Sequence, residues 1–578
     1  MSVIVQGPAA TAAVDDVAAI VRDFDAYTRA QDPIRAAQRG DLEAARRWPD
    51  NSPEAVTARK AALLGFQRRL QALPPKHIAG EDALNRDLLL DRVGTALDGF
   101  AFDEERIPFL SGDGFYTTPD YAALNTRIVD EATAAACVAR LEAIPAYYAR
   151  ETENMRRGVR TGFTQPRRTV ERAIADIEAQ LALPAEKSPL LAPFRALPGS
   201  MPATRRAELQ ARGQQAFDAK VRPAQRALLE FFRQEYLPAA RSGTGIGSVP
   251  QGREYYAYLA RRHTSTDMTP QQIHELGLAE VKRIRARMDA TIVATGFRGS
   301  FQEFLAAARK DPRFYVSGAE YGEKASEVAK RADFLLPQYF GMLPRLTYGV
   351  MPMPAGLESS ANGYLPGSPE QGVAGMVVYK PWMAEKMPTF GIAAWVLHEG
   401  VPGHHLQIAL SQETPDLPEF RRADDVTAYV EGWALYSERL GEEMGIYRDP
   451  YEQFGRLSLE IWRACRLVID TGMHVLGWTR DQGIACLQEN SALAPTEIEF
   501  EVDRYIAWPG QAVAYKVGEL KIVELRERAA QALGAQFDLR AFHDLILGSG
   551  PMPLDVLERR IDDWVTARLQ KTARQAPR

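Results

Sequence analysis

Three of the eight histidines in this chain lie close together, in the segment WVLHEGVPGHHLQ. His398 is followed directly by Glu399, and two further histidines, His404 and His405, come shortly afterwards. Neutral imidazoles and carboxylates are usual zinc ligands, and a catalytic zinc site takes three protein ligands and a water. In the H-E-x-x-H motif of zinc peptidases the glutamate is the general base. The segment therefore predicts a zinc site with Glu399 as the base.

The spacing of these histidines differs from the H-E-x-x-H motif, because Pro402 occupies the place of the second histidine. At about 100° per residue on a regular helix, His404 lies roughly 240° around the axis from His398, and His405 lies about 10 Å further along it. A regular helix therefore cannot bring these imidazoles to one ion. Pro402 removes an N–H and Gly403 permits unusual dihedral angles, so we expect a break that returns one histidine to the site. The alternative is a helix end with incidental histidines.

A third ligand is expected from another element. The segment TAYVEGWALYSERLG has the apolar spacing of a helix, and Glu431 lies in it among apolar neighbours. An unpartnered carboxylate in such surroundings is costly, and a metal ion would remove that cost. Glu438, two turns further on, is the rival candidate. The alternative without a metal is an ion pair of Glu431 with Arg439 or another base.

Helical patterns dominate the chain around this cluster. Apolar residues recur at three-to-four spacing in segments such as 82–97, 131–158 and 205–236. Thr269-Pro270-Gln271-Gln272 has the form of a capping box that begins another helix. Asp424 and Asp425 are expected to cap the helix that carries Glu431.

The only clear β pattern falls between residues 345 and 380, in RLTYGVMPMP and VAGMVVYKP. The predicted fold is therefore mostly α, with a small β-sheet beside the zinc-site helix. A Gly- and Pro-rich stretch at 237–252 indicates a loop between lobes. We expect an N-terminal helical lobe over 1–250 and a catalytic lobe over 251–578.

Composition limits the class of protein. The chain has 578 residues, 46% of them hydrophobic, and a formal charge of −5, which fits a globular protein and argues against nucleic acid as a partner. Three cysteines make no disulfide framework. The first residues lack the basic region of a secretory signal, and no stretch has the length of a membrane span. We therefore expect a cytoplasmic monomer or homodimer with no membrane partner.

HEGVPGHHLQ followed by EGWALYSERLG resembles the bacterial family called "domain of unknown function 885", whose members are described as zinc peptidases or lipoproteins. Segments 255–284, 467–478 and 503–522 extend the resemblance over most of the chain. More distantly the family is similar to helical zinc peptidases: angiotensin-converting enzyme, thimet oligopeptidase and the thermostable carboxypeptidases.

The resemblance implies two helical lobes around a deep channel and a bound Zn²⁺. It implies His398 and His404, rather than His405, as ligands, with Glu431 as the third. It also implies that His474 donates a hydrogen bond to the reaction oxyanion. In the related peptidases an edge strand precedes the metal segment, so strand 375–379 is expected to be such an edge and to bind an extended peptide.

Further site residues flank a Pro-Gly loop near residue 510. Arg504 suits recognition of a substrate carboxylate, and the hydroxyls of Tyr505 and Tyr515 can donate to a tetrahedral intermediate. We assign Tyr505 to catalysis and Arg504 and Tyr515 to substrate binding. An ordinary helix–loop surface is the alternative.

The predicted function is a zinc-dependent hydrolase that cleaves peptide bonds of short peptides through a metal-activated water. One alternative is a zinc amidohydrolase that acts on a small-molecule amide or a modified peptide from a biosynthetic pathway. Another is a non-catalytic helical binding protein that retains the fold.

Overall fold

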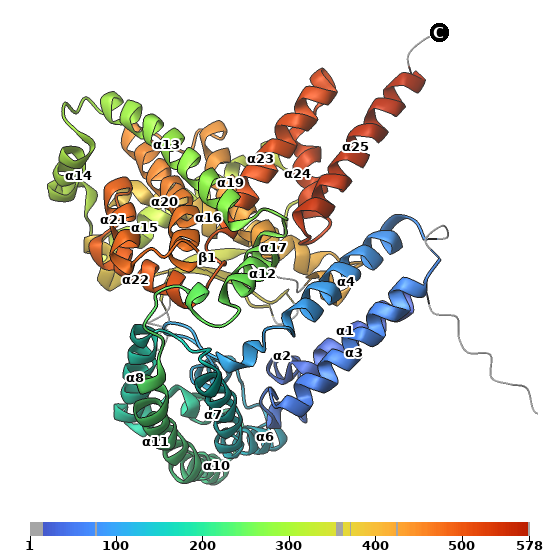
Figure 1. Cartoon of the computed structure of the whole chain (residues 1–578), viewed down its shortest axis with the longest axis vertical. Coiled ribbons are helices and arrows are strands. Elements are labelled where there is room, and N and C mark those ends of the chain that lie inside the picture. Colours follow the sequence, from blue (N-terminus) through green and yellow to red (C-terminus); the bar gives the residue numbers. More distant parts are fainter. Residues whose placement is uncertain (1–15, 75–77, 354–361, 370–371, 423–425, 576–578) are drawn as a thin grey trace, which may run out of the picture.

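The computed structural model describes residues 16–74, 78–353, 362–369, 372–422 and 426–575 (Figure 1). The structure is mostly helical with one small sheet, which confirms the predicted fold class. None of the helices in these ranges combines the length and hydropathy that a bilayer span requires. Asp424 and Asp425, the expected caps, lie outside the described residues.

The first half of the chain consists of helices joined by short loops. The 205–236 segment, expected as one helix, is interrupted by π-helical turns at Phe217–Val221 and Phe232–Tyr236. The α-helices in this half are α1 (Val17–Gln31), α2 (Pro33–Gln38), α3 (Pro53–Ala72), α4 (Gly80–Gly99), α5 (Thr118–Leu124), α6 (Glu131–Glu142), α7 (Ile144–Thr161), α8 (Arg167–Ala182), α9 (Ala192–Arg195), α10 (Ala203–Ala216) and α11 (Arg222–Phe231).

The second half holds the sheet and the longest helices. The predicted capping box is present, because Thr269 and Gln272 cap the start of α13 reciprocally. The elements are α12 (Gly252–Thr264), α13 (Pro270–Ala294), α14 (Phe301–Lys310), α15 (Gly318–Tyr339), β1 (Tyr348–Pro352), β2 (Gly363–Leu365), β3 (Gly375–Tyr379), α16 (Ile392–Glu399), α17 (His404–Glu413), α18 (Glu419–Arg422), α19 (Thr427–Glu443), α20 (Pro450–His474), α21 (Arg480–Asn490), α22 (Pro495–Ala507), α23 (Ala514–Leu533), α24 (Leu539–Leu547) and α25 (Leu554–Gln575).

The sheet has the strand order β1-β3-β2, with β1 parallel and β2 antiparallel to β3. The expectation that strand 375–379 is an edge is therefore wrong, because β3 pairs on both sides and its residues are mostly buried. The outer positions belong to β1 and β2, and β2 is a three-residue strand that is too short to show an alternating pattern.

Three apolar clusters form the interior. One joins α1, α3 and α4 to helices between α15 and α25, so that the ring centroids of Phe24 and Phe420 lie 6.2 Å apart. A second draws its buried residues from Trp48 and from 109–236, a range that includes the group of helices at the bottom of Figure 1. The third lies among residues 284–512. The proposed boundary near residue 250 and the deep channel stay predictions.

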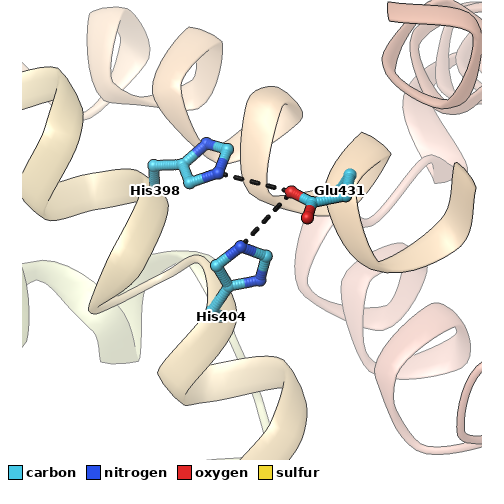
Figure 2. A group of neighbouring side chains, drawn as sticks. All are labelled: His398, His404 and Glu431. Atoms are coloured by element: carbon cyan, nitrogen blue, oxygen red, sulfur yellow. Dashed lines mark ion pairs between the residues drawn. The ribbon is translucent and has the colours of Figure 1, made fainter. Parts of the chain in front are cut away.

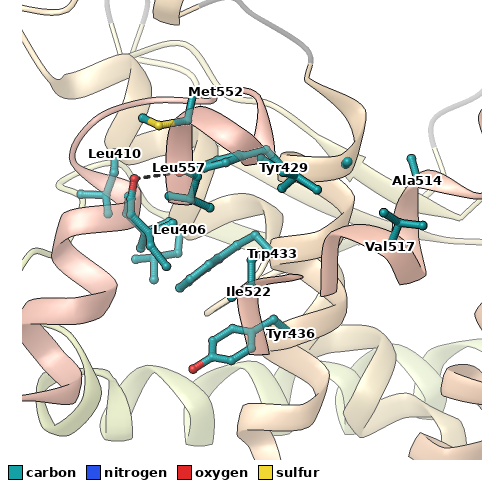
Figure 3. Packing of buried hydrophobic residues seen from close by; sticks show 14 of the residues in the cluster. Leu406, Leu410, Tyr429, Trp433, Tyr436, Ala514, Val517, Ile522, Met552 and Leu557 are labelled. Carbon is teal, nitrogen blue, oxygen red and sulfur yellow. Dashed lines mark hydrogen bonds between the residues drawn. The ribbon is translucent and has the colours of Figure 1, made fainter. Parts of the chain in front are cut away.

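The packing of α19 fixes the direction of its acidic residues. Tyr429, Trp433 and Tyr436 form its core face and lie among apolar side chains of α17, α23 and the start of α25 (Figure 3). Glu431 is two residues, or roughly 200°, from both Tyr429 and Trp433, so it faces the other way. Glu438, seven residues after Glu431, returns to the same face.

Helices α19 and α23 approach each other at two glycines. A Cβ atom built on Gly518 would lie 1.9 Å from the carbonyl oxygen of Ala428, and one on Gly432 would lie 2.5 Å from the backbone of Gly518. Only glycine permits so close an approach of two backbones. The contact brings Glu431 of α19 and Tyr515 of α23 to neighbouring positions.

Candidate metal centre

The helix through the histidine cluster is broken, as its spacing predicted. Helix α16 ends at Glu399, residues 401–403 form a turn, and α17 begins at His404. A Cβ on Gly403 would lie 2.0 Å from the carbonyl oxygen of His398, so the turn folds directly onto the end of α16. The indole N–H of Trp433 donates to the carbonyl oxygen of Pro402 (2.8 Å) and holds the turn against α19.

His398, His404 and Glu431 converge from three helices (Figure 2). Their ligand atoms all lie within 4.8 Å of one another. Glu431 Oε2 is 3.5 Å from His398 Nε2 and 3.4 Å from His404 Nε2. The side chains are largely buried, with exposed fractions of 4%, 12% and 18%.

These separations fit a metal ion better than hydrogen bonds. An N–H···O bond has a donor–acceptor distance near 2.9 Å, and Glu431 Oε2 is a buried oxygen with no hydrogen-bond partner among the described residues. Two ligands about 2.05 Å from a tetrahedral zinc ion are separated by roughly 3.3 Å. The three residues therefore have ligand chemistry that could hold a metal ion, and the two distances to Glu431 fit one.

Glu438, the rival ligand, contacts the other nitrogen of the first histidine. Its Oε1 is 2.8 Å from His398 Nδ1, and the side chain is 1% exposed. A carboxylate on Nδ1 places the proton there and leaves Nε2 as the lone-pair donor that a metal requires. Glu431 and Glu438 lie on the same face of α19, so Glu431 faces Nε2 of His398 and Glu438 faces Nδ1.

The ionisable groups of the cluster shift one another's pKa values. Burial alone would raise the pKa of Glu431, but His404 and His398 hold it well below its ordinary value. Burial raises the pKa of Glu399, against the opposing fields of the same two histidines. Glu399 comes directly before the turn, and its Oε2 would be 3.9 Å from a Cβ on Gly363 of β2. The Glu399 carboxylate thus lies near both the triad and β2.

His405 bonds to residues of the sheet region and lies apart from the triad. Its Nδ1 is 2.9 Å from the hydroxyl of Tyr364, and its Nε2 is 3.0 Å from the carbonyl oxygen of Leu346. Burial lowers its pKa to about 4, so the ring is neutral near pH 7. Both nitrogens are occupied in joining α17 to the sheet region, whereas His404 Nε2 faces Glu431.

Tyr515 is the further predicted residue that lies beside the triad. Its ring is nearly parallel to that of His398, with centroids 6.5 Å apart. Burial raises its pKa, and the charge of Glu431 adds to that rise. Arg466 lies over the same phenol ring, with its guanidinium carbon 4.3 Å from the ring centroid. Sequence reasoning missed Arg466, which only the packing of α20 on α23 brings here.

The other predicted residues have partners elsewhere. The backbone N–H of Ile246 donates to His474 Nδ1 (2.9 Å), and His474 Nε2 donates to the carbonyl oxygen of Tyr505 (3.0 Å). This arrangement leaves His474 no N–H for an oxyanion. The hydroxyl of Tyr505 accepts from Trp462 and Arg466 and is buried.

Arg504 is likewise occupied by neighbouring side chains. Its guanidinium donates to Gln511 (2.9 Å) and to Glu501 (3.0 Å). The structure therefore places Tyr515 next to the triad and places Arg504, Tyr505 and His474 in networks around it.

A family model described as "Bacterial protein of unknown function (DUF885)" matches residues 33–561. The chain belongs to the DUF885 family. No curated protein matches it. Among solved structures, one named a "putative lipoprotein" from Colwellia psychrerythraea is 27% identical, covers 95% of this chain and 98% of its own, and superposes with a TM-score of 0.90. A second, a "putative lipoprotein of unknown function" from Shewanella oneidensis, is 20% identical over 94% and 99%, with a TM-score of 0.73.

These two solved structures contradict the expected cytoplasmic location. Both are named as lipoproteins, and a lipoprotein is held at a membrane of the cell envelope by its lipid. The expectation rested on the residues that open the chain and on its few cysteines, and neither feature identifies the compartment of a folded domain.

Proposed function

We propose that this DUF885 protein is a zinc-dependent hydrolase that cleaves amide bonds of short peptides. The observation that supports the proposal is the convergence of His398, His404 and Glu431, with Glu399 adjacent to them. When held by these three ligands, a zinc ion supplies Lewis acidity toward a carbonyl oxygen and a water.

The remaining steps belong to side chains of the site. Glu399 takes a proton from the attacking water and passes it to the leaving amine, so that amide and water give a carboxylic acid and an amine. Burial of Glu399 favours its protonated carboxyl group, which is the form present after it has taken the proton and before it releases it. In this proposal Tyr515 donates its phenolic hydrogen to the developing oxyanion, and the position of its ring beside His398 supports that role. Glu438 keeps His398 in one tautomer throughout.

A peptide is favoured as substrate because of the strand next to Glu399. β2 pairs with β3 on one side and is an outer strand among the described strands. An extended peptide can add to such an edge through main-chain hydrogen bonds. Peptides that are N-methylated along the backbone cannot donate those bonds, so we expect them to bind more weakly than unmodified peptides of the same sequence.

The decisive experiment combines metal analysis with one substitution. We expect about one zinc per chain, and we expect Glu399→Gln to retain the zinc but to lose at least about 100-fold in hydrolysis of a peptide library. Glu385→Gln, which makes the same change at an exposed site, should match the parent in both measurements. Hydrolysis by Glu399→Gln at the parental rate would refute the assignment of the base. A metal-free parent protein would refute the hydrolase.

We also propose that the protein works in the cell envelope, as the names of its two solved relatives suggest. Fractionation of the native host, with detection of the chain in envelope or soluble fractions, tests this location.

A further inference from the structure

A cavity lies away from the metal centre, where α1, α2, α3 and α4 meet α18. Its volume is about 340 Å³. This is within the range of sites that hold one small molecule. Neither the triad nor Glu399 lines this cavity, so its chemistry is separate from the proposed hydrolysis.

The floor of the cavity is apolar and fixed by the core. Phe24, Leu63, Val93 and Phe420 line it, and each of these side chains is less than 10% exposed. The rings of Phe24 and Phe420 meet edge to face, at an interplanar angle of 86°. Asp25 holds the start of α18 in place by accepting from the backbone N–H groups of Glu419 (3.1 Å) and Phe420 (2.9 Å).

The rim of the cavity is cationic. Five arginines line it against two acids, Asp32 and Glu419. Three more acids, Asp25, Asp50 and Glu105, interact with these arginines from outside the cavity, so the positive excess belongs to the lining residues themselves. The rim arginines are Arg29, Arg35, Arg39, Arg59 and Arg92.

Most of these guanidinium groups already have protein partners. Arg29 and Arg39 both bind the carboxylate of Glu419, which shows that the rim accepts a carboxylate between two helices. Arg59 binds Glu105 at 3.2 Å. Arg92 donates to the carbonyl oxygen of Phe420 (3.0 Å).

Arg35 is the exception. Among the described residues its side chain makes one ion pair, at 3.9 Å to Asp32, and half of the side chain is exposed. Asp32 itself accepts from the backbone N–H of Arg35 (2.9 Å) as the cap of α2, so its charge is shared with the helix start. The guanidinium of Arg35 therefore keeps donors that can bind an anion at the mouth of the cavity.

We propose that this cavity binds a small anionic amphiphile, a molecule with one phosphate or carboxylate head group and a single apolar chain. The head group pairs with Arg35 at the rim, and the chain lies on the floor formed by Phe24, Leu63 and Val93. The floor alone would accept any apolar molecule, and the arginines select for an anion.

The test uses octyl phosphate, below its micellar concentration, in calorimetric titrations of the full chain. We expect Arg35→Glu to weaken binding at least about tenfold, because it removes a charge-assisted bond and adds a repulsive charge. Arg22→Glu makes the same charge change on an exposed part of α1 outside the cavity, and we expect it to stay within about twofold of the parent. Thermal unfolding of both variants checks that each is folded, and Arg35→Ala gives a milder loss if Arg35→Glu is unstable.

Three results would overturn the proposal. Binding of octyltrimethylammonium as tight as that of octyl phosphate would show that the rim does not select charge. Inorganic phosphate with the same affinity as octyl phosphate would show that the apolar floor is unused. Equal losses in Arg35→Glu and Arg22→Glu would show that binding follows net charge and not this cavity.

Discussion

The bond between Glu438 and His398 should set the metal affinity of the centre. The two atoms are 2.8 Å apart in a fully buried environment. In Glu438→Ala, the Nδ1–H of His398 loses its partner, which costs about 1–3 kcal/mol, or roughly 10–100-fold in zinc affinity. In Glu438→Gln a neutral oxygen still accepts the bond. Since charge-assisted bonds are about twice as strong as neutral ones, we expect a loss of less than about tenfold.

Competition with a chromophoric chelator measures these affinities at fixed pH. Glu442→Gln is the matched control, because it removes a charge from α19 one turn further on. The Glu442 carboxylate binds Arg287 and Arg456 and does not contact His398. Arg463, 3.4 Å from Glu438, also loses a partner in both Glu438 variants, so unfolding is measured separately from metal binding. Parental zinc affinity in Glu438→Ala, or an equal loss in Glu442→Gln, would refute the role of this carboxylate.

Two further predictions concern the turn and the buried histidines. Gly403→Ala should lose zinc binding, because its Cβ would lie 2.0 Å from the carbonyl oxygen of His398, whereas Gly391→Ala, with no atom within 4 Å, should bind zinc as the parent does. Burial lowers the pKa of His543 to about 3, whereas the value in the unfolded chain is near 6.5. The neutral, buried histidine therefore contributes its full stability above pH 6.5, and that contribution is lost as the pH falls toward 3. At pH 5 the loss is about 2 kcal/mol, and chemical unfolding of His543→Gln across this range should show a flatter pH dependence; a parallel curve would contradict the assignment.

The break between α16 and α17 could be predicted from the sequence because it follows from local geometry. The rotation per residue separates His398 from His404 on a regular helix, and Pro402 with Gly403 supplies the only nearby means of bending it. The position of Glu431 could be predicted for a similar reason. The apolar spacing of α19 defines its core face, and Glu431 lies on the opposite face of the helix.

Other features depend on contacts that are distant in sequence. The position of His405 is set by Tyr364 and Leu346, which precede it by some forty to sixty residues. The same holds for His474, whose partner Ile246 lies in another part of the chain. Strand order in the sheet, and the placement of Arg466 against Tyr515, likewise arise only when the helices pack.

The contact between Phe24 and Phe420 has a consequence for synthesis. The two rings belong to one core, yet about 400 residues separate them in the chain. At a translation rate of about 5–20 residues per second, α18 leaves the ribosome roughly 20–80 s after α1. During that interval Phe66 of α3 already covers part of Phe24, but the side that packs on Phe420 stays exposed, so the nascent chain is expected to engage a chaperone before the core can close.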